Sequence, residues 1–136
     1  RIAPLICFED SMARVVRRAA KKLPHLLVNL TNDAWFGKSA GARQHLENAR
    51  FRAIETRLPL LRATNDGVTA LINPRGVLVS ELCGSESRSV QEPGFLAGEL
   101  DLTEPRETFY VQWGEWPVWG SMLLVALGIW MRRKVA

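Results

Sequence analysis

Residues 2–11 read I-A-P-L-I-C-F-E-D-S, an apolar run that ends at a cysteine and passes directly into residues typical of a helix start. A short, continuous apolar run such as residues 2–7 is typical of a buried strand. Asp10 or Ser11 can cap the helix that follows. This junction places Cys7 at the carboxyl edge of a sheet, beside backbone N–H groups that are free to bind another group.

Strand and helix patterns alternate along the rest of the chain up to about residue 102. The expected elements, in order, are a strand at 2–7, a helix that ends at Pro24, a strand at 26–31, a helix at 42–57, strands at 60–64, 68–72 and 77–80 separated by turns at 65–67 and 73–76, and a last strand at 95–102. This order predicts an α/β layered fold with a mixed sheet.

The amino-acid composition favours one folded domain and argues against several classes of protein. The chain has 136 residues, a net charge of +4 and 47% hydrophobic residues, which suits one folded domain and excludes a disordered chain. The basic residues lie on predicted helix faces without interleaved aromatic residues, so we expect no nucleic-acid partner. Two cysteines without metal-ligand spacing predict neither a disulfide scaffold nor a metal or cofactor. The chain opens on Arg1 directly before an apolar run, which indicates part of a longer protein.

The carboxyl-terminal residues follow a different pattern. Residues 116–131 carry no formal charge, and the basic residues at 132–134 follow at once. A helix of 16 residues spans about 24 Å against roughly 30 Å of hydrocarbon, but arginines can snorkel and Trp113 and Gly114 can extend the span. Tryptophans near both ends suit the two headgroup layers. We therefore expect a transmembrane helix within residues 113–136, after a domain of residues 1–112; a buried core helix is the alternative.

Cys7 is the candidate nucleophile. The end of a strand just before a helix is the geometry of a nucleophile elbow, and the N–H of Phe8 could stabilise an oxyanion there. A free thiol, with a pKa of about 8.5, is only a few per cent thiolate at neutral pH, so Cys7 needs a separate base or a neighbouring cation. The residues alone leave a buried, inert cysteine open as the alternative. Cys83 borders a polar loop and is expected to be a bystander.

Three stretches together resemble one family. They are P-L-I-C-F-E at 4–9, N-L-T-N-D-A-W-F-G-x-S at 29–39, and Q-H-L-E-x-A-R-F-R-A-I-E-T-R-L-P-L-L-R-A-T-N-D-G-V-T-A at 44–70. They are similar to the carboxyl-terminal half of the apolipoprotein N-acyltransferases, membrane-embedded members of the nitrilase (carbon–nitrogen hydrolase) superfamily. The resemblance covers nearly the whole chain apart from about residues 81–95. It implies part of a nitrilase-like α-β-β-α sandwich followed by one transmembrane helix.

The resemblance also implies a reaction and its residues. The family moves an acyl chain from a phospholipid, through a cysteine thioester, to the N-terminal amine of a diacylglyceryl apolipoprotein. Cys7 matches the nucleophile and Glu9 a supporting carboxylate. Phe8 stands where the family often has Tyr, and Trp35 matches an aromatic residue of the active-site loop, so both are expected at the substrate.

The family's location and its missing parts follow from the same resemblance. The domain is expected in the periplasm of a multi-pass protein of the bacterial inner membrane, with the carboxyl terminus in the cytoplasm, as the basic residues at 132–134 also favour. The general-base Glu and the oxyanion-stabilising Lys of the family's triad lie upstream of the cysteine, outside this chain. We therefore expect no turnover by this chain alone.

Several polar residues have structural interpretations that compete with functional ones. His45 in the second helix is expected to be a satisfied structural residue rather than a base. Arg62 lies inside a predicted strand, so it must find a partner if it is buried, and we expect it to brace the sheet. For Asp33, a loop-positioning role and a self-bonding turn are equally favoured. The basic face of the first helix (Arg14, Arg17, Arg18, Lys21 and Lys22) is either a solvated face or a contact for anionic headgroups.

Two other function classes remain open at this point. A membrane-tethered, nitrilase-type amidase would release ammonia from a small amide. A non-catalytic, membrane-anchored module would keep the fold without using Cys7. The presence of Cys7 argues against the module, and the tryptophan-flanked tail argues against the amidase.

Overall fold

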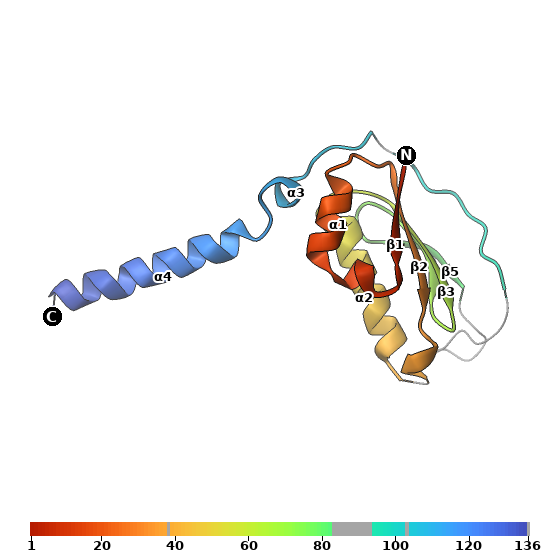
Figure 1. Cartoon of the computed structure of the whole chain (residues 1–136), viewed down its shortest axis with the longest axis horizontal. Helices are drawn as coiled ribbons and strands as arrows, with labels where there is room; N and C mark the ends of the chain where they lie inside the picture. The colour runs from red at the N-terminus through yellow and green to blue at the C-terminus, as the bar shows by residue number, and fades with distance from the viewer. Residues whose placement is uncertain (38, 83–93, 103, 136) are drawn as a thin grey trace.

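The computed structural model describes residues 1–37, 39–82, 94–102 and 104–135 (Figure 1). Five strands form one sheet in the order in which they occur along the chain. The strands β1 (Ile2–Ile6), β2 (Leu26–Asn32) and β3 (Leu60–Asn65) run parallel. The strands β4 (Thr69–Ile72) and β5 (Leu78–Leu82) continue the sheet as an antiparallel meander. The expected mixed α/β sheet is confirmed.

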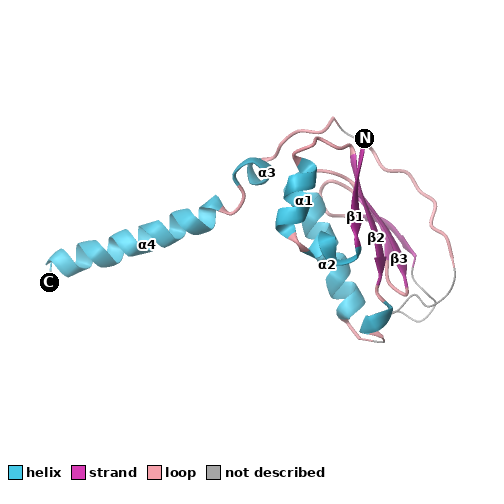
Figure 2. Ribbon diagram, viewed as in Figure 1, coloured by secondary structure: helices cyan, strands magenta, loops and turns pink. Residues whose placement is uncertain are grey.

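Two helices cover one face of the sheet, as Figure 2 shows. The helix α1 (Ala13–Ala20) connects β1 to β2, and α2 (Gly41–Thr56) connects β2 to β3. Two successive crossovers that advance the sheet in one direction with the same handedness place their helices on the same face. The core between these layers is apolar and fully buried; its members include Leu5, Val16, Leu27, Leu46, Leu60 and Ile72.

The opposite face of β1 and β2 is apolar, and none of the described residues covers it. Strand residues alternate between the two faces, so Ala3 and Leu5 point to the helices while Ile2 and Ile6 point away. Ile2 is 65% exposed, and Leu30 of β2 is also exposed. Such an apolar patch on a sheet is typical of a face that packs against another layer. The described residues supply one sheet and one helix layer of the expected sandwich.

The predicted last strand at 95–102 is wrong. Residues 94–102 form no strand. Gly98 instead lies against the side chains of Leu71 and Ser80, and Gly94 lies against Leu82. Because the segment crosses over the sheet and contacts side chains, its backbone does not lie beside the edge of β5, where it could pair.

The helix start after Cys7 also differs from expectation. Residues Cys7–Ser11 form a 3-10 helix, η1, and α1 begins at Ala13 with Met12 at its N-cap and no side-chain cap. Asp10 is fully buried and bonded to other side chains. Its carboxylate is therefore engaged in the interior and caps nothing.

The carboxyl-terminal segment forms two helices, not one. The short helix α3 (Phe109–Trp113) ends at Gly114, whose φ of 64° a residue with a side chain rarely adopts. The helix α4 (Trp116–Val135) then projects away from the domain (Figure 1). Trp113 and Gly114 thus do not extend α4, contrary to prediction.

α4 is apolar and exposed. Within the part of the chain that the structure describes, no helix is both long and apolar enough to count as a membrane span. The predicted transmembrane helix is therefore not confirmed. The alternative of a buried core helix does not describe α4 either, because its side chains are exposed, Leu124 by 71%.

Candidate active site

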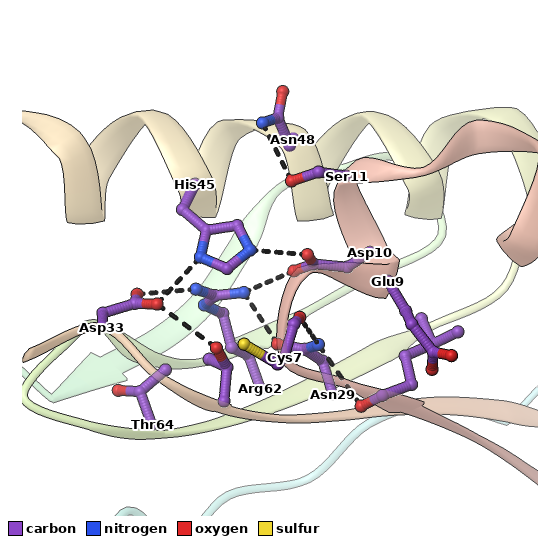
Figure 3. Close-up of polar contacts among 12 residues, drawn as sticks. Cys7, Glu9, Asp10, Ser11, Asn29, Asp33, His45, Asn48, Arg62 and Thr64 are labelled. Atoms are coloured by element: carbon purple, nitrogen blue, oxygen red, sulfur yellow. Dashed lines mark hydrogen bonds and ion pairs between the residues drawn. The ribbon is translucent and has the colours of Figure 1, made fainter. Parts of the chain in front are cut away.

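Cys7 lies at a sharp turn between β1 and η1 (Figure 3). Its φ of 53° falls in the left-handed region, which costs a non-glycine residue roughly 1 kcal/mol or more. The thiol is half-buried and free of any disulfide. A cysteine at a strained strand-to-helix turn matches the elbow geometry predicted for a nucleophile.

Two side chains fix this turn by hydrogen bonds to backbone groups on either side of the sulfur. Glu9 accepts a hydrogen bond from the backbone N–H of Ile6 at 2.8 Å. Asn29 of β2 donates from Nδ2 to the carbonyl of Cys7 at 3.1 Å and to that of Leu5 at 3.4 Å. The Cys7 backbone is thus tied both to its own turn and to the neighbouring strand.

A buried charge cluster lies directly behind this turn and holds Asn29 (Figure 3). Arg62 of β3 donates from Nη1 to Asn29 Oδ1 at 2.8 Å and to Asp10 Oδ2 at 2.5 Å. Its Nη2 donates to Asp33 Oδ2 at 2.8 Å. Asn29 and Arg62 are register partners in the parallel β2–β3 pair, which brings their side chains side by side.

His45 of α2 bridges the two carboxylates of this charge cluster. Its Nδ1 lies 2.8 Å from Asp33 Oδ1 and its Nε2 lies 2.6 Å from Asp10 Oδ1. Arg62, Asp10 and Asp33 are at most 1% exposed, and His45 is 2% exposed. Two carboxylates, one guanidinium and one imidazolium make the cluster electrically neutral, which a buried set of charges requires.

The charge cluster keeps His45 protonated. Burial by itself would lower the pKa of His45, but the hydrogen bonds to Asp10 and Asp33 outweigh it and raise that pKa to about 9. Burial would raise the pKa of Asp33, but the hydrogen bond from His45 and the charge of Arg62 outweigh it and lower that pKa. With both ring nitrogens engaged and protonated, His45 has no lone pair with which to act as a base.

The β3–β4 turn closes the cluster from another side. The backbone N–H of Asp33 donates to the carbonyl of Asn65 at 2.9 Å. Gly67 packs so closely that a Cβ there would lie 2.6 Å from Asp33 Oδ2. The N-D-G turn at 65–67 therefore needs glycine because it lies directly against the cluster.

The two predicted aromatic residues lie on the exposed side of the site. Phe8 is 47% exposed, and its ring packs on His45 with 5.1 Å between centroids. Trp35 follows β2 in the 3-10 helix η2 (Ala34–Phe36) and is 78% exposed. Because parallel β1 and β2 end at the same edge of the sheet, Trp35 and Cys7 share that edge.

Sequence reasoning anticipated part of this arrangement. The interpretations of His45 as a satisfied structural residue and of Arg62 as a residue that needs partners are confirmed. The roles of Asp10 and Asn29 were missed. The available signal was polar residues within apolar strands: Asn29 and Arg62 each interrupt such a run, and the parallel pairing places them together. Cys83 lies outside the described residues.

Comparison with known proteins identifies the family. The carbon–nitrogen hydrolase family matches residues 1–104, which is most of the chain. The chain belongs to the carbon–nitrogen hydrolase family. Among the described residues, no group of three or more His, Cys, Asp or Glu side chains could hold a metal ion.

Individual relatives of this carbon–nitrogen hydrolase chain share one name. It is 38% identical over 135 residues to the apolipoprotein N-acyltransferase of Vibrio vulnificus, covering 98% of this chain and 25% of the relative. It is 42% identical to the apolipoprotein N-acyltransferase of Bradyrhizobium diazoefficiens, covering 98% of this chain and 23% of the relative. The resemblance predicted from the sequence is confirmed. The chain spans about a quarter of the length of these relatives.

Solved structures support the fold. A carbon–nitrogen hydrolase from Helicobacter pylori superposes with a TM-score of 0.54 at 15% identity, over 65% of this chain and 38% of that one. An amidase from Nesterenkonia sp. AN1, carrying an acrylamide adduct at its active-site cysteine, superposes with a TM-score of 0.51 at 23% identity, over 60% of this chain and 34% of that one. At such identities the likeness extends to the fold alone.

Proposed function

We propose that this chain carries the nucleophile of an apolipoprotein N-acyltransferase and that Cys7 is that nucleophile. The observation that carries the proposal is the half-buried free thiol at the strained end of β1, in a chain 38% identical to an enzyme of that name. A structural cysteine in the core would be enclosed by apolar side chains. Cys7 is instead partly exposed and has its backbone fixed by Glu9 and Asn29.

The proposed reaction has two halves. The Cys7 thiolate attacks the ester carbonyl of a phospholipid, the C–O bond breaks, and the lysophospholipid leaves with a proton while the acyl chain stays as a thioester. The N-terminal amine of a lipoprotein then attacks the thioester carbonyl, the C–S bond breaks, and the amine loses a proton. Backbone N–H groups of η1 suit the negative charge on the carbonyl oxygen in both steps.

The base for these steps comes from outside this chain in our proposal. His45 is buried and protonated, which removes it from that role. Glu9 is engaged with the Ile6 N–H, so we assign it the positioning of the turn rather than proton transfer. The family resemblance implies a Glu and a Lys upstream of Cys7, outside this chain. Because it lacks them, this chain alone would not catalyse the reaction.

Phe8 and Trp35 are proposed to contact the acyl chain. Both are large apolar side chains that remain exposed at the edge of the sheet where Cys7 lies. Exposed aromatic residues around a polar reacting centre suit a long hydrocarbon substrate.

The membrane location is also part of the proposal. α4 exposes apolar side chains around its whole circumference, which a helix in water does not tolerate without a partner. We propose that α4 lies in the inner membrane with the domain on the periplasmic side and the basic carboxyl terminus in the cytoplasm. The uncovered face with Ile2, Ile6 and Leu30 then packs against the rest of the nitrilase-like sandwich.

The test is mass spectrometry of the intact gene product incubated with phospholipid and no acceptor. We expect a mass increase of one acyl chain, located on the peptide that contains Cys7 and removed by neutral hydroxylamine, as a thioester is. Cys7→Ser is the control and should show no hydroxylamine-sensitive adduct. An unmodified Cys7 in an otherwise folded protein would contradict the proposal.

A membrane-tethered amidase is the second candidate, because the chain shares its fold with the Nesterenkonia amidase. The two candidates differ in substrate. An amidase would release ammonia from short aliphatic amides in a Cys7-dependent way, and the acyltransferase would not. Ammonia release without acylation by phospholipid would favour the amidase.

A further inference from the structure

A small cationic cavity lies where α1 meets α3 and the first turn of α4. Its volume is about 360 Å³, within the range of small-molecule sites. The lining consists of two arginines from α1 and of aromatic and acidic residues from the carboxyl-terminal helices: Arg14, Arg17, Tyr110, Trp113, Glu115 and Trp119. None of these residues belongs to the proposed catalytic set, so the cavity is a separate feature.

The two arginines give the cavity an unbalanced positive charge. Arg14 and Arg17 are three residues apart in α1 and therefore share a helix face. The Arg17 guanidinium lies directly against Gly114, in the space that a Cβ at that position would occupy. Across the ranges that the structure describes, neither arginine forms an ion pair, and Glu115 lines the cavity without pairing with them.

The remaining lining groups suit a phosphate ester. Arginine guanidiniums bind phosphate oxygens through paired N–H donors. Burial, followed by the charge of Glu55, raises the pKa of Tyr110, so its hydroxyl keeps the proton that it can donate. The largely exposed indoles of Trp113 and Trp119 add apolar lining, and tryptophan is enriched at the headgroup level of membranes.

The position of the cavity indicates where such a phosphate would come from. α4 begins at Trp116, directly beside the cavity, and projects away with its apolar side chains exposed (Figure 1). If α4 enters the bilayer, as proposed above, the cavity lies at the level of the headgroups. This step rests on the proposed membrane location of α4.

We propose that this cavity binds the phosphate of a phospholipid headgroup and holds the domain at the membrane surface. The lipid is retained there and not consumed, because none of the lining residues belongs to the proposed catalytic set. The basic face of α1, for which the sequence left two interpretations open, then divides into a binding pair (Arg14 and Arg17) and a solvated remainder.

The experiment measures lipid binding to the delipidated intact protein in detergent by native mass spectrometry. Cys7→Ser is present throughout, so that acyl transfer cannot affect the result. Dioleoylphosphatidylglycerol is compared with dioleoylglycerol, which has the same chains and no phosphate. The double substitution Arg14→Gln/Arg17→Gln should weaken phosphatidylglycerol binding about 30-fold, since each cation near a lipid phosphate contributes about a factor of five.

The matched control removes two charges outside the cavity, one from α1 and one from the turn that follows it, as Arg18→Gln/Lys22→Gln. It should change binding less than about threefold, and Arg14→Lys/Arg17→Lys, which keeps the charges, should retain most of it. Equal losses in the two glutamine variants would overturn the proposal in favour of a diffuse basic surface. Equal binding of dioleoylglycerol, or displacement of the lipid by millimolar inorganic phosphate, would also overturn it. None of these results depends on the Cys7 thioester, so either proposal can fail without the other.

Discussion

Arg62 is fully buried, and its guanidinium joins side chains from η1, from β2 and from the loop after β2. No other protein side chain could replace it, because the two Nη atoms reach Asp10, Asn29 and Asp33 at once through a planar fork. The backbone geometry of Cys7 depends indirectly on this guanidinium. Arg62 donates a hydrogen bond to Asn29, and Asn29 donates one to the Cys7 carbonyl.

Arg62→Lys should therefore lower both stability and Cys7 acylation. A single ammonium cannot satisfy both carboxylates and the Asn29 amide, so we expect about 3 kcal/mol less unfolding free energy, the usual cost of breaking a buried ion pair. The measurement is chemical denaturation of the intact protein in detergent, together with the thioester assay. Arg18→Lys, on the exposed face of α1, is the control and should change neither quantity.

The protonated state of His45 makes stability depend on pH. The pKa of His45 is raised from 6.5 to about 9 in the folded protein, so its contribution is fully present below pH 6.5 and is lost as the pH rises through 9. A shift of that size corresponds to about 3 kcal/mol. We expect the thermal midpoint to fall between pH 7 and pH 10, and His45→Gln to remove most of that fall. An equal fall in both proteins would show that other groups cause it.

The parallel strands bring the residues at their carboxyl ends together at the candidate site. β1, β2 and β3 are parallel, so Cys7 after β1, Asp33 after β2 and Asn65 at the end of β3 all lie at one edge of the sheet. The carboxyl ends of parallel strands are where α/β folds place their sites. In η1, Asp10 points inward instead of capping α1, which connects the turn at Cys7 to the buried charge cluster.

Gly67→Ala tests the contact between the β3–β4 turn and the cluster. The added Cβ would lie 2.6 Å from Asp33 Oδ2, so the turn or the carboxylate must move. Overpacking of this kind costs about 1–3 kcal/mol, and we expect a matching loss in unfolding free energy with a raised sensitivity to high pH. Gly128→Ala in α4 meets no neighbouring atom within 4 Å and is the control, expected to be neutral. A neutral Gly67→Ala would show that the turn moves freely.

The part of the chain that the structure describes has two apolar surfaces that need partners. One is the face of the sheet with Ile2, Ile6 and Leu30, and the other is α4. In the proposed function, the exposed face of the sheet packs against the other half of the sandwich, and α4 contacts lipid. The candidate site at Cys7 lies at the edge of the sheet, and α3 joins this domain to α4.

The proposed topology predicts the location of the carboxyl terminus. A green fluorescent protein fused after Ala136 of the intact protein should fluoresce, as it does in the cytoplasm, and a fused alkaline phosphatase should be inactive. Leu124→Arg places a charge at the centre of α4 and should make the free energy of membrane insertion less favourable by about 3 kcal/mol. In part of the population the carboxyl terminus should then stay in the periplasm, where the phosphatase fusion is active and the fluorescent fusion is dark. Leu124→Ala is the uncharged control. An active phosphatase fusion in the unsubstituted protein would contradict the topology.

Four features could be predicted from the amino-acid sequence: the order of the main strands and helices, the mixed sheet, the place of Cys7 at a strand end and the family resemblance. These features depend on local periodicity and on contiguous motifs, which are visible in one dimension. The expected strand at 95–102 and the expected cap from Asp10 or Ser11 are wrong, because a segment that crosses a sheet and a carboxylate that turns inward both depend on distant contacts.

Only the tertiary structure decided how the polar residues combine. Asp10, Asn29, Asp33, His45 and Arg62 come from five separate segments, and no spacing along the chain relates them. Parallel pairing brings Asn29 beside Arg62. The packing of α2 on the sheet places the His45 ring between the carboxylates of Asp10 and Asp33. Burial of charge demands such partners, but only the fold determines which ones are within reach.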